Sequence, residues 1–248
     1  MVSAGYKRDI IATGDARDGK STCLKLLVDL LRSQNKSLVL YDFDKRDKFK
    51  GYHKYIPVCD NLNFFKGNTD VILDDISEVD ASVIFVDMPG QYVSEMLEEI
   101  EDCYFFEQLA CRGWQVTFLQ PISHRFDCID YLKQIMDYSG NLAKYVVVRN
   151  LYFDKYFVEF EKEVSQQLYQ FGGITITLDQ LQQNVYQAVD SLGLPLQEAC
   201  NSSQLFLLYR SYLYRWMKSF NQQLLSNNLV SEYLGIYSQS VIEPEEIF

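Results

Sequence analysis

The sequence predicts a doubly wound α/β fold, because short apolar runs alternate along the chain with stretches of helical periodicity. Within most of these runs the residues are nearly all apolar and do not alternate with polar ones. The apolar runs cover residues 10–12, 37–41, 82–86, 116–119, 144–148 and 174–177. Runs that are apolar throughout indicate strands covered on both faces, which is typical of a mostly parallel sheet between helices. Because ligands of such sheets bind beyond the carboxyl ends of the strands, functional residues are expected there.

Helices are predicted where apolar residues recur at three- and four-residue spacing. One helix is expected over residues 20–32, and the run at 37–41 is followed by a loop-rich stretch. A helix over residues 92–112 has an apolar face opposite an acidic one, as expected of a helix that lies on a sheet. The apolar positions of this helix and of the next one are Val93, Met96, Leu97, Ile100, Tyr104, Phe105, Phe126, Ile129, Leu132 and Ile135.

The C-terminal part of the chain has a different pattern, so we expect an α/β domain over residues 1–200 and an extension over 201–248. Apolar and aromatic residues recur there at helical spacing, which predicts one long helix packed on the domain or extending from it. The recurring residues are Leu205, Leu207, Leu208, Tyr212, Leu213, Trp216, Phe220 and Leu224. The acidic end at 242–246 is too charged to pack.

Composition excludes several classes of protein. With 248 residues, 48% hydrophobic and 23% charged, the chain is that of a folded globular protein and not of a disordered or collagen-like one. The net charge of −11 opposes long-range attraction to nucleic acid and anionic lipid, so we expect no strong direct binding to nucleic acid and no membrane association.

The cysteines give no sign of a metal centre or of disulfides. The six cysteines form no C-x-x-C pair and only two histidines are present, so we expect reduced core thiols and no structural metal. Neither an apolar leader nor a stretch of about 18 apolar residues is found. A cytoplasmic location is therefore expected.

A phosphate-binding loop follows the first predicted strand. Residues 14–21 read GDARDGKS, which satisfies G-x-x-x-x-G-K-[ST], and a predicted helix begins at once. In such a loop the backbone N–H groups and the helix N-terminus face the phosphates. Lys20 would reach the β- and γ-phosphates and Ser21 would bind Mg²⁺. The alternative is a glycine-containing turn that only precedes a helix.

Two sets of carboxylates follow neighbouring apolar runs and are expected at the same sheet edge. Asp42 and Asp44 end the second run, and Asp87 ends the third, three residues before Gly90. Asp87 is placed to bind Mg²⁺ through a water molecule, and the N–H group of Gly90 could reach the γ-phosphate. A lone Asp at a strand end is more often a cap or turn residue, but the adjoining loop favours the functional interpretation.

Together these segments resemble the MinD/ParA family of deviant-Walker P-loop ATPases, over roughly residues 6–200. The matching segments are residues 13–22, 42–44, 86–90, 120–123, 146–150 and 188–195, each short but in the family's order. The resemblance implies a doubly wound sheet, an ATP-dependent face-to-face homodimer, and slow hydrolysis that acts as a switch.

The resemblance also implies roles for individual residues. Lys20, Asp44 and Asp87 would be catalytic, with Asp44 positioning the attacking water, and Ser21, Asp44 and Asp87 would serve Mg²⁺. Asn150 would contact the adenine edge, although an Asn at a strand end can equally be a helix cap. The other implied contacts of ATP are Gly14, Asp15, Ala16, Arg17, Asp18, Gly19, Lys20, Ser21, Thr22 and Gly90.

One position departs from the family's pattern. The signature lysine, which crosses the dimer interface to the partner's phosphates, falls on Asp15. A carboxylate about 6 Å from a phosphate charge, at an effective dielectric constant of about 20, costs roughly 3 kcal/mol per charge pair. Asp15 must therefore point away or be neutralised by Arg17, or trans-activation is lost. We hypothesise that Arg17 takes over part of the lysine's role; a solvent-facing arginine is the alternative.

The altered signature and the D-M-P-G third strand are similar to the StbB/TraL-like proteins of plasmid stability and mobilisation. This likeness implies a role in plasmid partition or positioning through a protein partner, an adaptor or a DNA-binding protein. Two other functions stay open: a nucleotide-binding scaffold without turnover, which Asp15 supports, and a small-molecule kinase, for which no arginine-rich lid is evident.

Three other segments contain residues that could contact a ligand or a partner. Residues 208–218 interleave basic and aromatic side chains, which could contact nucleic acid or a partner helix, but a helix packed on its own domain is preferred. Residues 45–50 form a positive cluster beside Asp44, with a solvated turn and a contact to phosphate, DNA or the partner protomer equally open. His124 and Asp127 lack a neighbouring nucleophile and are interpreted as helix-start residues.

Overall fold

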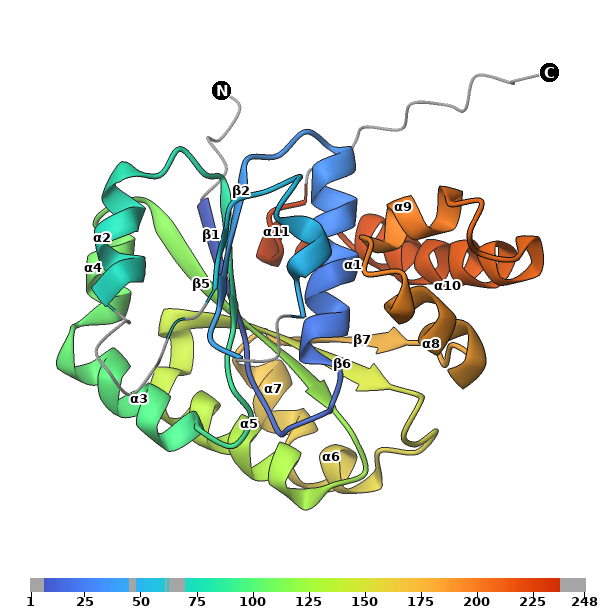
Figure 1. Ribbon diagram of the computed structural model, residues 1–248. Coiled ribbons are helices and arrows are strands. Elements are labelled where there is room, and N and C mark those ends of the chain that lie inside the picture. Colours follow the sequence, from blue (N-terminus) through green and yellow to red (C-terminus); the bar gives the residue numbers. More distant parts are fainter. Residues whose placement is uncertain (1–6, 45–47, 61, 63–69, 237–248) are drawn as a thin grey trace.

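The computed structural model describes residues 7–44, 48–60, 62 and 70–236, and over these residues it contains a seven-stranded sheet (Figure 1). The strand order is β3-β2-β4-β1-β5-β6-β7, and every neighbouring pair is parallel. The strands are β1 (Lys7–Ala12), β2 (Leu38–Asp42), β3 (Val58–Cys59), β4 (Val83–Asp87), β5 (Trp114–Ile122), β6 (Ala143–Asn150) and β7 (Ile174–Leu178).

Helices cover both faces of the sheet, which confirms the predicted doubly wound fold (Figure 1). One face carries α1 (Lys20–Ser33), α8 (Gln183–Ser191), α9 (Leu196–Asn201), α10 (Leu207–Ser226) and α11 (Asn228–Tyr233). The other carries α2 (Asp70–Glu78), α3 (Val93–Asp102), α4 (Phe105–Ala110), α5 (Phe126–Ser139), α6 (Val158–Glu163) and α7 (Ser165–Gln170). The short segments η1 (Lys50–Tyr52) and η3 (Gly140–Leu142) are 3₁₀ helices.

Strand β1 lies at the centre of the sheet, where the chain order changes direction. It pairs with β4 on one side and β5 on the other, while β2 lies one strand further out. Side chains alternate between two buried cores: Ile10 and Ala12 belong to the core under α1, and Ile11 belongs to the core under α3 and α5. The crevice beyond the carboxyl end of β1 is therefore the expected ligand position in this topology.

The predicted helix over residues 92–112 is wrong as a single element. The chain forms α3 and α4 with a break at Tyr104, whose φ of 51° is left-handed and cannot continue a helix. Tyr104 is consequently 68% exposed and does not join the apolar face assigned to it. Phe126, Leu207 and Leu208 were also expected in the core, but each stands in the first turn of its helix and is more than half exposed.

Other elements extend or add to the prediction. β1 begins at Lys7, three residues before the predicted run. The prediction missed these positions because Lys7, Arg8 and Asp9 are charged, although Arg8 and Asp9 are buried. The segment expected to be loop-rich contains η1, β3 and α2. Cys111 is exposed in the turn after α4 and is therefore not a core thiol, and none of the six cysteines forms a disulfide.

The C-terminal helices pack on the α1 side of the sheet. Leu213, Trp216, Met217, Phe220 and Leu224 of α10 belong to the same buried core as α1 and β1. A domain boundary near residue 200 therefore stays a proposal, and the acidic end at 242–246 lies outside the described residues. Within the part of the chain that is described, no helix combines the length and apolar character needed to cross a bilayer.

Candidate nucleotide site

The loop between β1 and α1 has the geometry of an anion-binding nest. Gly14 and Gly19 have φ angles of 122° and 105°, and Arg17 between them has a φ of 69°. Helix α1 begins at Lys20, and in the described structure the backbone N–H groups of residues 18–21 make no hydrogen bond. Consecutive free N–H groups at the positive end of a helix dipole provide donors for phosphate oxygens.

Lys20 is folded back onto this loop. Its Nζ atom donates to the carbonyl oxygens of Asp15, at 2.5 Å, and Gly14, at 3.3 Å, and the residue is 5% exposed. Burial lowers the pKa of Lys20, and the nearby carboxylate of Asp87 opposes that shift. The loop thus holds a buried ammonium group whose hydrogen-bond acceptors among the described residues are two carbonyls of the loop, which phosphate oxygens could replace.

Asp87 and Ser21 form a corner of oxygen atoms at the end of β4. Ser21 Oγ donates to Asp87 Oδ2 at 2.5 Å, while the fully buried Asp87 Oδ1 has no hydrogen-bond partner among the described residues. A buried carboxylate oxygen without a partner is costly unless a cation or ligand completes it. A serine hydroxyl and one or two carboxylates are the donor set with which proteins hold Mg²⁺ beside phosphates, so these residues fit the predicted metal. We refer to Ser21, Asp44 and Asp87 as the metal corner.

Asp44 joins the metal corner through a lysine that the sequence had placed only in a positive cluster. Lys48 Nζ lies 2.6 Å from Asp44 Oδ2, 2.7 Å from Ser21 Oγ and 3.6 Å from Asp87 Oδ2. A solvated turn was one of the two interpretations left open for this cluster. These contacts exclude it for Lys48. Residues 45–47 lie outside the described part of the chain.

Asp42 supports the corner from β2. Its Oδ1 atom accepts the N–H group of Asp44 at 2.8 Å, which shapes the turn after the strand. Burial, and then the neighbouring charge of Asp87, raise the pKa of Asp42 to about 7. Asp42 therefore contributes to the shape of the site more than to its negative charge near neutral pH.

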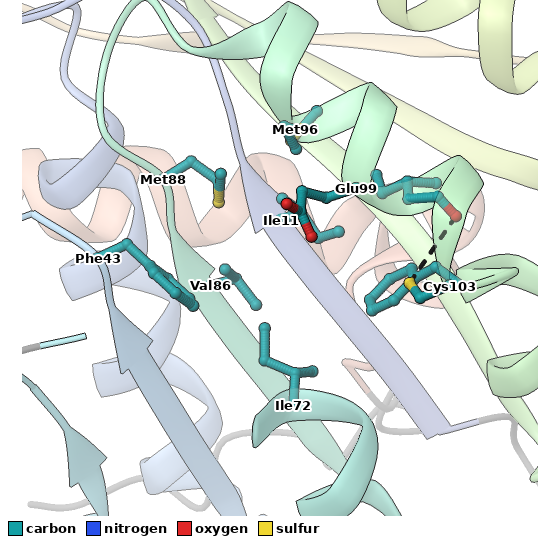
Figure 2. A pocket seen from close by; sticks show the side chains of 10 residues that line it. Ile11, Phe43, Ile72, Val86, Met88, Met96, Glu99 and Cys103 are labelled. Atoms are coloured by element: carbon teal, nitrogen blue, oxygen red, sulfur yellow. Dashed lines mark hydrogen bonds between the residues drawn. The ribbon is translucent and has the colours of Figure 1, made fainter. Parts of the chain in front are cut away.

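An apolar cavity on the opposite face of the sheet explains why these carboxylates point toward α1. Figure 2 shows Phe43 and Met88 beside Ile11 and Val86 in the lining of this cavity, which has a volume of about 30 Å³. Because side chains alternate along an extended chain, burying Phe43 and Met88 there directs Asp44 and Asp87 to the other face. Apart from Glu99 and Cys103, the residues that line the cavity are apolar, so it is not a candidate for the nucleotide site.

Asp15 is neutralised within its own chain by Arg125, in the turn before α5. Arg125 Nη1 lies 2.5 Å from Asp15 Oδ2, and Asp15 Oδ1 accepts the N–H group of Ala16 at 2.7 Å. Burial raises the pKa of Asp15, but these hydrogen bonds outweigh it and leave the pKa below its usual range. Arg125, and not Arg17 as one alternative supposed, therefore neutralises Asp15. Arg17 itself is exposed.

Asp18 stabilises the same loop through hydrogen bonds to its side chain. Its Oδ2 atom accepts from the N–H group of Asp15 at 3.1 Å and from Cys128 Sγ at 2.9 Å. Burial raises the pKa of Asp18, and burial beside Asp18 raises the pKa of Cys128 to about 12. The thiol is therefore a neutral donor. The loop is held in shape by side chains from β5–α5 as well as by its own glycines.

Asn150 and Gly90 pack directly against the loop. Asn150 Nδ2 donates to the carbonyl oxygen of Asp18 at 2.9 Å, and a Cβ atom on Gly19 would lie 2.7 Å from that nitrogen. A Cβ atom on Gly90 would lie 2.6 Å from the backbone nitrogen of Ala16. Both contacts bring predicted site residues together with the loop. Gly90 permits close approach to the backbone of Ala16, and Gly19 permits the φ of 105° before α1.

A cavity of about 230 Å³ adjoins the loop on the side of Asn150. Its walls include Gly19 from the loop, Thr22 from α1, Asn150 at the end of β6, Tyr152 just after it, and Trp216 from α10. Aromatic walls with a few polar groups are typical of a site for a flat heterocycle such as a nucleobase. Helix α10 thus contributes to the candidate site, which the sequence pattern did not predict.

Sequence reasoning missed Lys48 as a neighbour of the metal corner and Arg125 as the partner of Asp15. Lys48 stood in a cluster flagged for its charge, whereas Arg125 carried no signal, because it is 110 positions from Asp15. His124 and Asp127 flank the start of α5 as expected of helix-start residues. No group of three His, Cys, Asp or Glu side chains within the described ranges could hold a metal by itself.

Comparisons with known proteins gave no relative by sequence: no family model matches the chain, and no curated protein does. Among solved structures, the chain is similar to MinD from Aquifex aeolicus, with 15% identity, a TM-score of 0.47, and coverage of 86% of this chain and 97% of that one. It is similar to a putative plasmid partition protein from Borrelia burgdorferi bound to AMPPNP, with 14% identity, a TM-score of 0.49, and coverage of 89% and 99%.

A third similarity is to the signal recognition particle receptor FtsY from Elizabethkingia anophelis, with 16% identity and a TM-score of 0.44. It covers 58% of this chain, which spans about half the length of the FtsY chain. At these levels of similarity no residue role is transferred. The strand order, the loop after β1 and the geometry around it identify the crevice at the centre of the sheet as the candidate nucleotide site.

Proposed function

We propose that this protein binds ATP with Mg²⁺ at the loop of residues 14–21 and hydrolyses it slowly as a cytoplasmic dimerisation switch. The observation that carries the proposal is the row of free N–H groups at residues 18–21, beside the buried ammonium of Lys20 and the metal corner. Donors for phosphate and oxygen ligands for a cation thus converge from one loop and two strand ends.

Each group has a distinct task in this proposal. The loop N–H groups and Lys20 bind the phosphates, with Lys20 exchanging the carbonyl of Asp15 for phosphate oxygens. Ser21 and Asp87 hold Mg²⁺, which when bound neutralises charge on the transferred phosphoryl group. Asp44, held at the end of β2 by Asp42, positions the attacking water. Gly90 lies near enough to Ala16 for its segment to respond to the γ-phosphate.

The switch itself extends the proposal beyond the nucleotide site. We expect the ATP-bound protein to form a homodimer and to bind a protein partner, an adaptor or a DNA-binding protein, in plasmid or DNA partition, stability or positioning. A StbB/TraL-like role belongs to this proposal as well. The net charge of −11 supports contact with DNA through a partner and not directly.

The proposal is tested by binding of ATP to the Lys20→Ala variant. Removing the buried ammonium should abolish detectable ATP affinity in titration calorimetry with Mg²⁺, because the phosphates lose their central cation. The Lys162→Ala variant, which removes an exposed lysine of α6, should bind like the wild-type protein. Undiminished affinity in Lys20→Ala would overturn the assignment.

A second function is favoured by one observation. Asp15, at the position of the family's signature lysine, is engaged by Arg125 of the same chain and offers no cation to a partner protomer. This arrangement fits a nucleotide-binding scaffold with little turnover. The two functions differ in phosphate release, which a scaffold would not lose when Asp44 is replaced.

A further inference from the structure

The ammonium group of Lys48 lies where the three residues of the metal corner meet. Its Nζ atom is within 2.7 Å of oxygens of Asp44 and Ser21 and 3.6 Å from Asp87. The Lys48 side chain is 21% exposed, against 9% for Asp44 and 0% for Asp87, so the contacts are largely shielded from water. Charge-assisted contacts of this kind hold a flexible side chain in one place.

We propose that Lys48 is the resident cation of the metal corner in the nucleotide-free protein, and that Mg²⁺ must expel it in order to bind. This inference rests on the proposed function, because it concerns the same corner. In this inference Lys48 competes with Mg²⁺ for the oxygens of the metal corner and does not bind the metal. It therefore sets the concentration of Mg²⁺ that the site requires.

The geometry makes the competition direct. Mg²⁺ binds oxygens at about 2.0–2.1 Å and demands near-octahedral geometry, so it needs open approach to its ligands. Lys48 already donates to Ser21 Oγ and contacts both carboxylates. Two cations within contact distance of the same shielded oxygens repel each other strongly, so one has to leave.

The surroundings provide a place for the displaced side chain. A groove of about 390 Å³ adjoins the corner and is lined by Ser21, Lys25, Lys48, Lys50 and Asp190, among others. The Asp190 side chain is 62% exposed and lies 3.7 Å from Lys25, which makes it a second carboxylate available to an ammonium group.

The first test uses Mg²⁺ alone with the nucleotide-free protein. The melting temperature is followed during a Mg²⁺ titration for the wild-type protein, Lys48→Met, and the control Lys50→Met, which removes an exposed lysine of the same groove. The half-saturating Mg²⁺ concentration of Lys48→Met should fall about fivefold or more below that of the wild type, the worth of one shielded ion pair. A shift no larger than that of Lys50→Met overturns the proposal.

A second measurement on the wild-type protein does not depend on the variant folding. Amine-reactive labelling followed by peptide mass spectrometry compares Lys48 with Lys50 before and after addition of Mg²⁺. Lys48 should react faster when Mg²⁺ is added, because its ammonium group is released, and Lys50 should not change. Equal or slower labelling of Lys48 with Mg²⁺ overturns the proposal.

The same proteins separate failure of this inference from failure of the proposed function. With a fluorescent ATP analogue and Mg²⁺, binding to all three proteins at the same Mg²⁺ requirement overturns the role of Lys48 and keeps the proposed function. No binding to any of them overturns the proposed function, while the titration with Mg²⁺ alone still decides whether Lys48 and the metal compete.

Discussion

The two ends of β1 carry buried carboxylates in opposite circumstances. Asp9, near the amino end, is fully buried, neither of its oxygens is hydrogen-bonded to a described residue, and burial raises its pKa to about 8. Asp15, just beyond the carboxyl end, is equally buried but receives Arg125 and the N–H group of Ala16, so its pKa lies below the usual range. Neighbours, and not depth, decide which carboxylate is charged.

The difference shows how to recognise a site in this protein. Asp9 lies in register with Ile84 and Val116, on the apolar face under α3 and α5, and no described residue donates a hydrogen bond to its carboxyl group. Asp15, Asp18 and Asp87 at the other end each accept a hydrogen bond from another segment of the chain, with Arg125, Cys128 and Ser21 as the respective donors. A buried charge indicates function where partners from several elements converge on it, and otherwise indicates a cost to stability.

The largest expected effect is on turnover at the carboxyl end. Asp44→Ala should lower phosphate release at least about 100-fold, because the proposed water-positioning carboxylate is gone. Phosphate release is measured at saturating ATP and Mg²⁺, with the exposed Asp102→Ala of α3 as control. If wild type and Asp44→Ala release phosphate equally slowly, the protein is the scaffold and not the switch.

The next effect is on stability at the amino end. The unfolded chain releases the Asp9 proton at a pH near 4, whereas the folded protein keeps it to about pH 8, so ionisation favours unfolding and stability falls as pH rises through this window. Asp9→Asn should therefore raise the free energy of unfolding at pH 7 by about 2–4 kcal/mol. Urea unfolding at pH 5, 7 and 9 measures it.

The exposed Asp102→Asn serves as the control for removal of one carboxylate. Asp9→Asn should also flatten the pH dependence between pH 5 and 8, which Asp102→Asn should leave as in the wild type. A variant Asp9→Asn that is less stable at every pH would show that the carboxyl group has a favourable partner in the fold.

A smaller effect is expected from the ion pair at the carboxyl end. Arg125→Ala leaves the Asp15 carboxylate unneutralised beside the phosphates, which should weaken ATP affinity about two- to tenfold. Replacing Asp15 as well, in Asp15→Ala/Arg125→Ala, should restore part of the loss, because the repulsive charge is removed with its partner. An affinity unchanged in Arg125→Ala would mean that Asp15 does not face the nucleotide.

The smallest effect is expected from Arg17, which is exposed on the loop. Arg17→Ala should lower ATP-dependent dimerisation and the ATPase rate by about two- to fivefold if its guanidinium takes over part of the signature lysine's role. Sedimentation with a non-hydrolysable ATP analogue measures dimerisation, and Arg17→Lys serves as the charge-preserving control. Unchanged rate and dimerisation would refute that role.

Local patterns predicted the frame of the site, and distant partners completed it. The loop motif and Ser21 follow from residues close in sequence, since a strand, a glycine loop and a helix are a local unit. Asp87 was predicted from its place at the end of another apolar run, because parallel strands end at the same edge of the sheet. Arg125 and Trp216 reach the site through tertiary packing, which a single sequence does not encode as a spacing. Likewise the break between α3 and α4 depends on the positive φ of Tyr104, and the spacing of apolar residues gives no sign of that angle.

Trp216 has a practical consequence. The chain contains two tryptophans: Trp114 is buried on the α3 and α5 side of the sheet, and Trp216 borders the cavity beside Asn150, with its Nε1 atom donating to the carbonyl oxygen of Asp179. A heterocycle entering that cavity would stack near one indole and leave the other undisturbed. Intrinsic fluorescence, with Trp114 as an internal reference, could therefore follow occupancy in real time without any added dye.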